Sequence, residues 1–308
     1  MQVFSDTGAA PLSLRGNAVA LGNFDGVHRG HQAVIKLAAE AARARGLRLA
    51  AAVFEPHPRQ FFQPDAAPFR LQSPGQRINA LAALGVEIVF QIEFNAALAA
   101  LTDEQFARAE LAERIGAAHV TVGADFTFGK ARMGDAPALI AAGKRYGFAV
   151  SIADVLNESS AQKVSSSTIR KAIAEGRMDE AEALLTRPWA IEGVVMPGQA
   201  RGRTIGFRTA NITLGAYQRP AYGVYAVRVV AGGARRQGVA NIGVRPTVGG
   251  ASEPLVEAHL FDFEGDLYGR RIEVELIKFL RPEQKFESFD ALKTQIATDA
   301  ANAKAALL

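Results

Sequence analysis

The segment Gly22-Asn23-Phe24-Asp25-Gly26-Val27-His28-Arg29-Gly30-His31 follows a short apolar run at residues 18–21 and leads into a helical pattern at residues 32–45. This order predicts a strand, a glycine-rich turn and a helix. In an open α/β sheet such a turn lies at the carboxyl edge, where ligands bind, and the next helix start offers N–H groups and a positive dipole end. The segment therefore predicts a phosphate-binding loop.

Two histidines, His28 and His31, stand three residues apart in this loop. Histidine changes its charge near neutral pH, and Gly30 allows the backbone to approach a bulky polyanion. The spacing favours polyphosphate over zinc, because a helical zinc pair prefers positions i and i+4 and no cysteine or nearby third ligand completes such a site. Taken alone, the two histidines are weak evidence for a phosphate site, and the alternative is that they are ordinary turn residues.

Length and composition indicate an ordinary globular protein with two domains. The 308 residues exceed a usual domain of ~100–200 residues, and 49% of them are hydrophobic, enough to bury a sizeable core. No cysteine is present to form a disulfide or a thiolate metal site. The start lacks the pattern of a secretory leader and no apolar run approaches roughly eighteen residues, so we expect a cytoplasmic protein.

The formal net charge of +4 is mildly basic, and its lysines and arginines are scattered along the chain. Nucleic-acid binding usually needs a concentrated basic patch, whereas a small anionic substrate explains the excess equally well. We therefore expect small-molecule substrates and no nucleic-acid or membrane partner. The oligomeric state stays open.

From residue 17 to about residue 185, apolar runs typical of strands alternate with helical periodicity. The predicted strands cover residues 18–21, 47–54, 86–91, 119–122 and 148–152. The predicted helices cover residues 32–45, 75–84, 103–115 and 136–146. Candidate N-caps and C-terminal glycines agree with these bounds, namely Ser73, Thr102, Gly46, Gly85, Gly116 and Gly147. This alternation predicts a doubly wound, Rossmann-like α/β domain with a parallel sheet.

Near Arg187-Pro188-Trp189 the pattern changes to short β-rich runs separated by glycine-rich turns. These runs cover residues 191–195, 222–230, 236–242, 255–261 and 271–279, and a last helix is expected at residues 288–307. They predict an antiparallel β-barrel or sandwich with a C-terminal helix. We therefore expect one domain at residues 1–186 and a second at residues 187–308.

Two further motifs follow predicted strands of the first half. Phe54-Glu55-Pro56-His57-Pro58 is a rigid turn, for which a stiff loop and a binding role are about equally good explanations. Gly123-Ala124-Asp125-Phe126-Thr127-Phe128-Gly129-Lys130 is not a Walker A loop, because five residues separate its glycines and Ala131 replaces the required hydroxyl residue. Its acidic and aromatic side chains suit a pocket for a flat ring, and core packing is the equal alternative.

A third motif, Lys163-Val164-Ser165-Ser166-Ser167-Thr168-Ile169-Arg170, opens a helix. Its hydroxyls are plain helix caps when read alone. Four hydroxyls with helix N–H groups and Arg170 also predict a second anion site, which suits a departing pyrophosphate.

In this order the four motifs resemble the adenylyltransferase half of the bifunctional riboflavin kinase/FAD synthetases, and residues 22–31 resemble the signature of HxGH nucleotidyltransferases. The resemblance implies that the FMN phosphate attacks the α-phosphorus of ATP with Mg²⁺ present, without a covalent enzyme intermediate or a tightly bound prosthetic group. It assigns ATP binding to Gly22, Phe24, Asp25, His28, Gly30, His31, Ser166, Thr168 and Arg170, with His28, His31 and Arg170 catalytic. It assigns flavin binding to Pro56, Pro58, Asp125, Phe126 and Phe128. For Asp25, a local turn is the alternative role.

The second half opens with a glycine- and arginine-rich segment at residues 193–212 that predicts a phosphate-wrapping loop, with an ordinary mobile hairpin as the alternative. Thr209 and Asn211 stand two residues apart on an extended segment, so their oxygens point to one face as hard ligands for Mg²⁺.

This segment resembles the Gly-Phe-Pro-Thr-Ala-Asn motif of riboflavin kinases, and residues 241–248 resemble their Asn-Ile-Gly-x-Arg-Pro-Thr-Phe motif. The resemblance implies that Thr209 and Asn211 hold Mg²⁺ and ATP. It adds Gly198, Arg201 and Gly202 to the ATP site and Arg245 to the flavin site. Arg208 replaces the family's proline, which puts full kinase activity in doubt, and Val248 replaces a phenylalanine, which affects only local packing.

Glu257, in Glu257-Ala258-His259-Leu260, matches the general base of that family, which accepts the proton of the ribityl 5′-hydroxyl as it attacks the γ-phosphate of ATP. Without the family, a solvated strand face is the plainer interpretation of this glutamate. The whole pattern predicts an enzyme that converts riboflavin to FMN and FMN to FAD. Two alternatives stay open: an HxGH transferase for another acceptor with a regulatory β-domain, and a flavin or nucleotide sensor without catalysis.

Overall fold

The computed structural model describes residues 1–154, 164–196, 209–245 and 253–308. The chain divides into two compact units. The first unit comprises Met1–Ala67 and Pro74–Ser165, and the second comprises Pro68–Ser73 and Ser166–Leu308. None of the described helices is both long and apolar enough to span a membrane.

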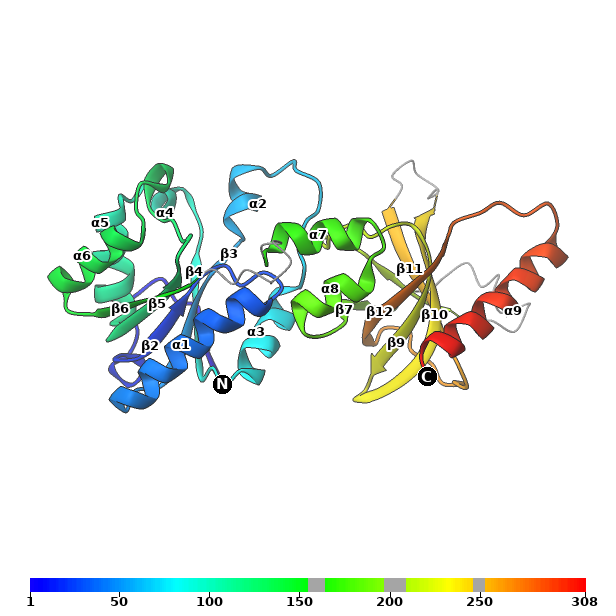
Figure 1. Ribbon diagram of the computed structural model, residues 1–308, viewed down its shortest axis with the longest axis horizontal. Helices are drawn as coiled ribbons and strands as arrows, with labels where there is room; N and C mark the ends of the chain where they lie inside the picture. The colour runs from blue at the N-terminus through cyan, green and yellow to red at the C-terminus, as the bar shows by residue number, and fades with distance from the viewer. Residues whose placement is uncertain (155–163, 197–208, 246–252) are drawn as a thin grey trace. The chain divides into compact units, whose positions relative to one another are not determined.

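The first unit is built on a six-stranded sheet with the order β1-β4-β3-β2-β5-β6, in which all paired strands are parallel (Figure 1). Its strands are β1 (Gln2–Phe4), β2 (Ala18–Leu21), β3 (Leu49–Glu55), β4 (Ile88–Glu93), β5 (His119–Gly123) and β6 (Ala149–Ala153). Its helices are η1 (Leu12–Leu14), α1 (Arg29–Arg45), α2 (Pro58–Phe62), α3 (Pro74–Ala83), α4 (Ala96–Ala100), α5 (Asp103–Phe106), η2 (Ala107–Ile115), η3 (Lys130–Arg132) and α6 (Ala136–Tyr146).

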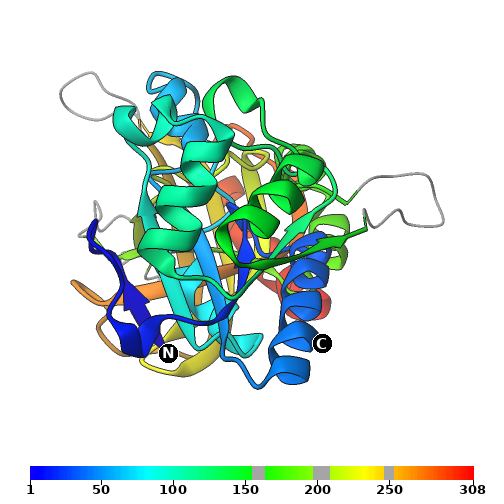
Figure 2. The same ribbon diagram turned by 90° about the vertical axis from the view of Figure 1, so that its left-hand side faces the viewer.

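Helices cover both faces of this sheet (Figure 2). The side chains of β2 alternate between the two layers: Ala18 and Ala20 pack with Ile35 of α1, and Val19 and Leu21 belong to the core on the other face. The sheet also has a switch point, because the chain runs from β2 to β3 and β4 on one side and then returns to β5 and β6 on the other. Ligands of open α/β sheets bind at such a point, at the carboxyl ends of the strands.

The sequence predicted the strands of this sheet within two residues, except for β1, which is a three-residue edge strand. The expected helix at residues 103–115 is the four-residue α5 followed by η2, a π-helical segment. Thr102 caps α5 in a capping box with Gln105, as expected. The glycines expected at helix ends, Gly46, Gly85, Gly116 and Gly147, all have positive φ.

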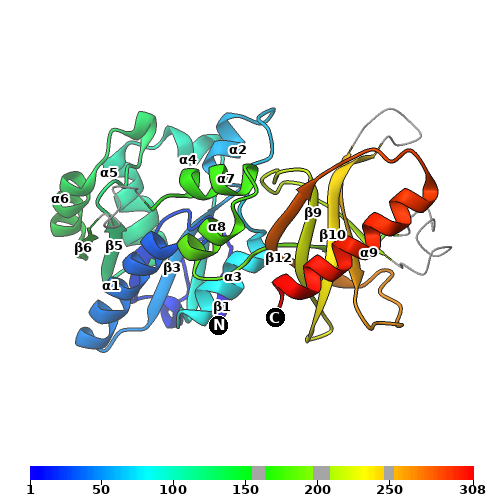
Figure 3. The same cartoon turned by 45° about the vertical axis from the view of Figure 1, so that its right-hand side comes forward.

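The second unit is a nearly closed antiparallel barrel with the strand order β7-β12-β9-β10-β11-β8 (Figure 3). Its strands are β7 (Trp189–Val194), β8 (Ala210–Thr213), β9 (Gly223–Ala231), β10 (Ala234–Arg245), β11 (Glu253–Leu260) and β12 (Arg271–Pro282), and its helices are α7 (Ser166–Ala174), α8 (Met178–Leu185) and α9 (Phe289–Ala306). The amide of Met196, just beyond β7, donates to the carbonyl oxygen of Asn211 in β8 at 2.9 Å, so the two ends of the sheet meet. The barrel is therefore the correct member of the predicted pair, and β8 is the strand that the sequence did not predict.

The segment Pro68–Ser73 packs with the second unit although it precedes α3 of the first. The indole Nε1 of Trp189 donates to the carbonyl oxygen of Leu71 at 2.7 Å, and the amide of Arg70 donates to Ala216 at 3.0 Å. Helices α7 and α8 also belong to this unit. The domain boundary between residues 186 and 187 stays a prediction.

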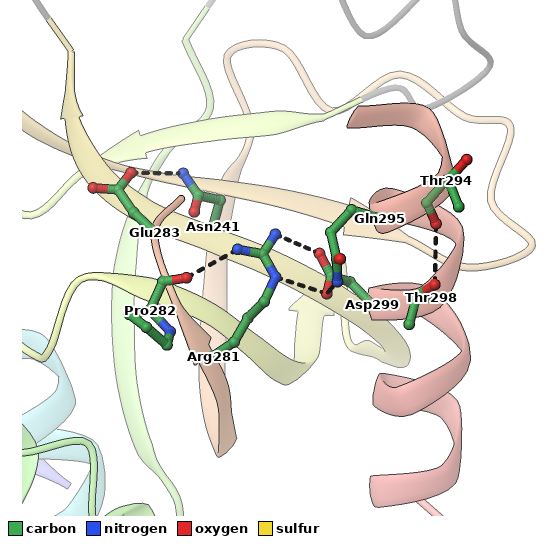
Figure 4. Close-up of polar contacts among 8 residues, drawn as sticks. All are labelled: Asn241, Arg281, Pro282, Glu283, Thr294, Gln295, Thr298 and Asp299. Atoms are coloured by element: carbon green, nitrogen blue, oxygen red, sulfur yellow. Dashed lines mark hydrogen bonds and ion pairs between the residues drawn. The ribbon is translucent and has the colours of Figure 1, made fainter. Parts of the chain in front are cut away.

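Helix α9 is anchored to β12 by a largely buried ion pair (Figure 4). The carboxylate of Asp299 accepts from Nε of Arg281 at 2.9 Å and from Nη2 at 2.7 Å, and it also accepts from Gln295 at 2.9 Å. Further along the helix, Ala303 and Leu307 share a buried apolar cluster with residues of β9 and β10. Both kinds of contact hold the last helix on the barrel.

We expect Asp299→Asn to lower the free energy of unfolding of the second unit by about 2–3 kcal/mol, because it leaves the Arg281 guanidinium with a weakened partner. This loss is smaller than for a fully buried pair, since the Arg281 side chain is 20% exposed. Trp189, the only tryptophan of the chain, lies in β7, so its fluorescence during denaturant unfolding reports on this unit. Lys293→Gln, at an exposed position of α9, is the matched control, and equal midpoints for both variants would contradict the anchoring role.

Candidate active sites

The loop between β2 and α1 lies at the switch point and has an unusual backbone. Phe24 and Val27 have φ values of 49° and 42°, and Gly26 has a φ of 91°. Residues other than glycine rarely adopt this left-handed region of backbone conformation, and a β-branched residue such as valine does so least of all. Phe24 and Val27 are each only 1% exposed, so core packing holds this loop in its strained conformation.

The two histidines of the loop form one unit at the start of α1. His28 is the N-cap, and its Nδ1 accepts from the amide of His31 at 3.4 Å. The two imidazole rings stack with their centroids 3.6 Å apart and an interplanar angle of 18°, and the Phe24 ring meets His31 edge-on at 5.3 Å. When the His28 ring is neutral, Nδ1 is thus the acceptor and Nε2 carries the proton.

This cap explains why α1 begins at Arg29 instead of residue 32 as predicted. Histidine is not among the usual N-cap residues, so the helix start carried no recognised signal. Gly30 lies in the first turn of α1, where a Cβ would lie 3.1 Å from Cε1 and 3.2 Å from Nδ1 of His28. A glycine here leaves room for the imidazole of His28.

The ends of the neighbouring strands carry the predicted flavin residues of the first unit. Pro56 follows β3, and Pro58 is the first residue of α2, which His57 caps by accepting from the amide of Arg59 at 3.1 Å. After β5, Asp125 is exposed at the same edge of the sheet.

Phe126 and Phe128, just beyond Asp125, stack with centroids 5.7 Å apart. Phe128 is buried in the core against Phe106, at 5.7 Å between ring centroids, and Phe126 packs against that core while half-buried. Phe128 is therefore a core residue, as one of the two alternatives from the sequence predicted. A flavin contact stays a prediction for both rings.

A residue that the sequence analysis missed, Arg77, connects the loop after β2 with the end of β3. Its side chain is 2% exposed. Nη1 donates to the carbonyl oxygens of Asn23 at 3.2 Å and of Phe54 at 3.3 Å, and Nη2 pairs with the Glu55 carboxylate at 2.9 Å. The available signal was its position four residues before Leu81, which places an arginine on the buried face of α3.

The predicted second anion site lies on α7, in the second unit. Ser166 is the first residue of this helix, and Thr168 and Arg170 follow in its first turns. Nε of Arg170 donates to the carbonyl oxygen of Phe69 at 2.7 Å, and the guanidinium lies 5.3 Å from the centre of the Phe69 ring. A role together with the histidine loop of the first unit stays a prediction.

The barrel places three polar residues in one row across neighbouring strands. Asn211 of β8 lies opposite Glu257 of β11, and Glu257 lies opposite Asn241 of β10. Residues directly opposite each other in antiparallel strands present their side chains on the same face, about 5 Å apart. The predicted base and one predicted metal ligand are thus direct neighbours.

Asn211 has the chemistry expected of a metal ligand. It is 5% exposed, and its Oδ1 is buried without a hydrogen-bond partner among the residues that the structure describes. Its Nδ2 is turned to the backbone, 3.5 Å from the carbonyl oxygen of Thr209. A buried amide oxygen of this kind is a hard ligand that suits Mg²⁺.

The row continues into Glu283, which the sequence analysis did not single out. Nδ2 of Asn241 lies 3.4 Å from Oε1 of Glu283, just beyond β12 (Figure 4). A Cβ on Gly243 would clash with the Glu283 carboxylate, so this glycine lets the carboxylate approach β10. No local pattern could reveal a contact between residues 42 apart in the sequence.

Several predicted residues of this half lie outside the described residues: Gly198, Arg201, Gly202, Arg208 and Val248. Arg245 is the last residue of β10 and lies opposite Glu253 of β11.

Comparisons with known proteins identify families for both halves of the chain. A family model described as FAD synthetase matches residues 11–168, and one described as riboflavin kinase matches residues 185–307. The chain is 44% identical over 291 residues to the bifunctional riboflavin kinase/FMN adenylyltransferase of Pseudomonas fluorescens, covering 94% of this chain and 93% of the relative. It is 41% identical over 309 residues to the protein of that name from Haemophilus influenzae, covering 99% of both. A crystal structure named macrolide-efflux protein, from Streptococcus pneumoniae, matches with a TM-score of 0.85, 31% identity and 97% coverage of both chains.

We expect Gly30→Ala to displace the His28 ring. Replacing a helical glycine by alanine ordinarily raises the free energy of unfolding by about 1 kcal/mol. A smaller increase, or a decrease, would reflect the close contact between the new Cβ and the imidazole of His28. The chain has five histidines, and their side-chain NMR signals provide the measurement. The signals of His28 and His31 should shift while those of His57, His119 and His259 stay in place, and unshifted signals for the first two would contradict the steric role of Gly30.

Proposed function

The chain belongs to the family of bifunctional riboflavin kinase/FMN adenylyltransferases, and we propose that the histidine loop and the polar row on the barrel are the centres of its two reactions. It phosphorylates riboflavin with ATP to FMN, and it transfers AMP from ATP to FMN to give FAD and pyrophosphate. In this proposal, residues 1–186 serve adenylyl transfer and residues 187–308 serve phosphorylation. Membership of this family argues against the two alternatives, a transferase for another acceptor and a sensor without catalysis.

In adenylyl transfer, an oxygen of the FMN phosphate attacks the α-phosphorus of ATP, and the bond from that phosphorus to the bridging oxygen of pyrophosphate breaks. The attacking phosphate oxygen is already ionised and needs no general base to remove a proton from it, so the protein contributes positioning and charge stabilisation. His28 and His31 bind the triphosphate at the helix start, next to Gly22, Phe24, Asp25 and Gly30. The support for these roles is the stacked histidine pair at the N-terminus of α1.

Ser166, Thr168 and Arg170 have their role in the same reaction, in which they hold the triphosphate and the leaving pyrophosphate. Hydroxyls and N–H groups at the start of α7, with a guanidinium one turn further, are the donors that such an anion requires. Pro56, Pro58, Asp125, Phe126 and Phe128 hold the flavin, and the stacking of the two phenylalanine rings supports their common role.

In phosphorylation, the Glu257 carboxylate accepts the proton of the riboflavin 5′-hydroxyl as that oxygen attacks the γ-phosphorus, and ADP leaves. Thr209 and Asn211 hold Mg²⁺ together with ATP, and the ion neutralises charge on the phosphates. The buried Oδ1 of Asn211 beside Glu257 supports this assignment. Gly198, Arg201 and Gly202 contribute to the ATP site and Arg245 to the flavin site as predicted from the sequence. A cytoplasmic location also remains a prediction.

Two single substitutions should separate the reactions. We expect His31→Ala to lower FAD formation from supplied FMN by about 10²- to 10³-fold and to leave riboflavin phosphorylation within twofold. Glu257→Gln should lower phosphorylation by about 10²- to 10⁴-fold and leave adenylyl transfer intact. Liquid chromatography of flavin products, with Mg²⁺-ATP and either riboflavin or FMN, measures both reactions.

The controls are His119→Ala for the first reaction, at the first residue of β5, and His259→Ala for the second, because neither histidine has an assigned role in the reaction. Equal loss of both reactions in either main variant would contradict the two-centre assignment.

Arg208 gives a separate prediction, because proline at its position stiffens the loop before Thr209 in the family motif. We expect Arg208→Pro to raise the rate of riboflavin phosphorylation several-fold and to leave FAD formation from FMN unchanged. The same product assay tests it, and an unchanged phosphorylation rate would show that arginine is fully tolerated there.

A further inference from the structure

Arg77 is a buried charge in a place where an apolar side chain would serve packing as well. It lies on α3 with only 2% of its side chain exposed, on the same helix face as the buried Leu81. Burying a guanidinium is unfavourable unless it is paired and hydrogen-bonded, and replacing buried ion pairs by apolar residues is often neutral for stability. The ion pair with Glu55 therefore does not by itself account for an arginine at this position.

The partners of Arg77 lie at the carboxyl ends of two adjacent strands, beyond the last paired residues of β2 and β3. The last contact between β2 and β3 is the amide of Gly22 donating to Ala52 at 3.1 Å. Just beyond it, Nη1 of Arg77 joins the carbonyl oxygens of Asn23 and Phe54, at 3.2 and 3.3 Å. The guanidinium thus connects the loop that follows β2 with the last residues of β3.

The first of these carbonyls belongs to the residue directly before the strained part of the histidine loop. Phe24 has a φ of 49°, and its ring meets that of His31 edge-on at 5.3 Å. His31 in turn stacks on His28 with 3.6 Å between centroids. A continuous chain of contacts leads from the guanidinium through the Asn23 carbonyl and the Phe24 ring to the histidine pair.

We propose that Arg77 is a positioning residue for adenylyl transfer, which fixes the loop after β2 against the end of β3 and so places His28 and His31. This inference rests on the proposed function of the histidine loop. The planar fork of arginine suits the task, because one nitrogen reaches both carbonyls while the other pairs with Glu55 at 2.9 Å. Lysine, a point charge, would keep the ion pair and lose the bridge between the carbonyls.

The test compares variants of the full chain in both reactions. We expect Arg77→Met to lower kcat for FAD formation by about 10- to 100-fold with a smaller change in the KM for ATP, since misplaced donors weaken transition-state contacts most. Riboflavin phosphorylation by the same molecules should stay within twofold. Arg77→Lys keeps the ion pair with Glu55 and loses the bridge between the carbonyls, so it should lower kcat to a similar extent, and it keeps the test valid if Arg77→Met does not fold.

Arg114 provides the matched control. It is also a buried arginine of the first unit, and it pairs with Glu110 at 2.8 Å and donates from Nε to the carbonyl oxygen of Asp6 at 3.2 Å. Arg114→Met should leave kcat for FAD formation within threefold and leave the NMR signals of His28 and His31 in place, whereas Arg77→Met should shift those signals. Equal effects of the two substitutions on kcat and on the signals would reduce Arg77 to a structural residue and overturn the proposal.

His31→Ala separates this inference from the function it rests on. If His31→Ala keeps full FAD formation, the loop is not the adenylyl-transfer centre and both assignments fail. If His31→Ala abolishes FAD formation while Arg77→Met behaves like Arg114→Met, the proposed function stands and only the role of Arg77 fails.

Discussion

The capping of α1 by His28 is the interaction on which the first unit's site depends. A histidine that accepts from the amide of His31 both starts the helix and sets the orientation of its own ring. Because the two histidines stand three residues apart, the cap brings the second ring over the first, 3.6 Å between centroids. One local hydrogen bond thereby aligns a helix N-terminus and two imidazoles at the switch point of the sheet, where an anion is best held.

The second unit reaches a comparable result by strand register. Asn211, Glu257 and Asn241 belong to three strands that are far apart in sequence, yet antiparallel pairing sets them directly opposite one another. A shift of the register by one residue would turn these side chains to the apolar interior of the barrel, where Ile212 and Val256 now pack. The hydrophobic alternation that builds the barrel is therefore the same constraint that assembles the polar row.

The sequence reveals features whose signals are local. Strands β2 to β6 and the glycine-terminated helices follow from apolar runs and caps, and the histidine loop follows from its motif. Features that depend on distant partners were missed. β1 is a short, mostly exposed edge strand that forms only because β4 offers it hydrogen bonds. The role of Glu283 is visible only in the structure, where the end of β12 brings it to Asn241. The segment Pro68–Ser73 is likewise placed by a distant contact, the hydrogen bond from Trp189 to Leu71.

Two arginines that pair with carboxylates show why such distant partners matter. Both Arg281 and Arg77 also donate to main-chain carbonyl oxygens, but Arg281 reaches only that of its chain neighbour Pro282, at 2.9 Å. Arg281 binds Asp299 through two nitrogens and fastens a helix to a sheet, a task that apolar packing shares through Ala303 and Leu307. Arg77 instead donates from one nitrogen to two main-chain carbonyl oxygens, one just after β2 and one near the end of β3. Apolar side chains cannot satisfy carbonyl oxygens, so the partners of Arg77, more than its burial, require an arginine there.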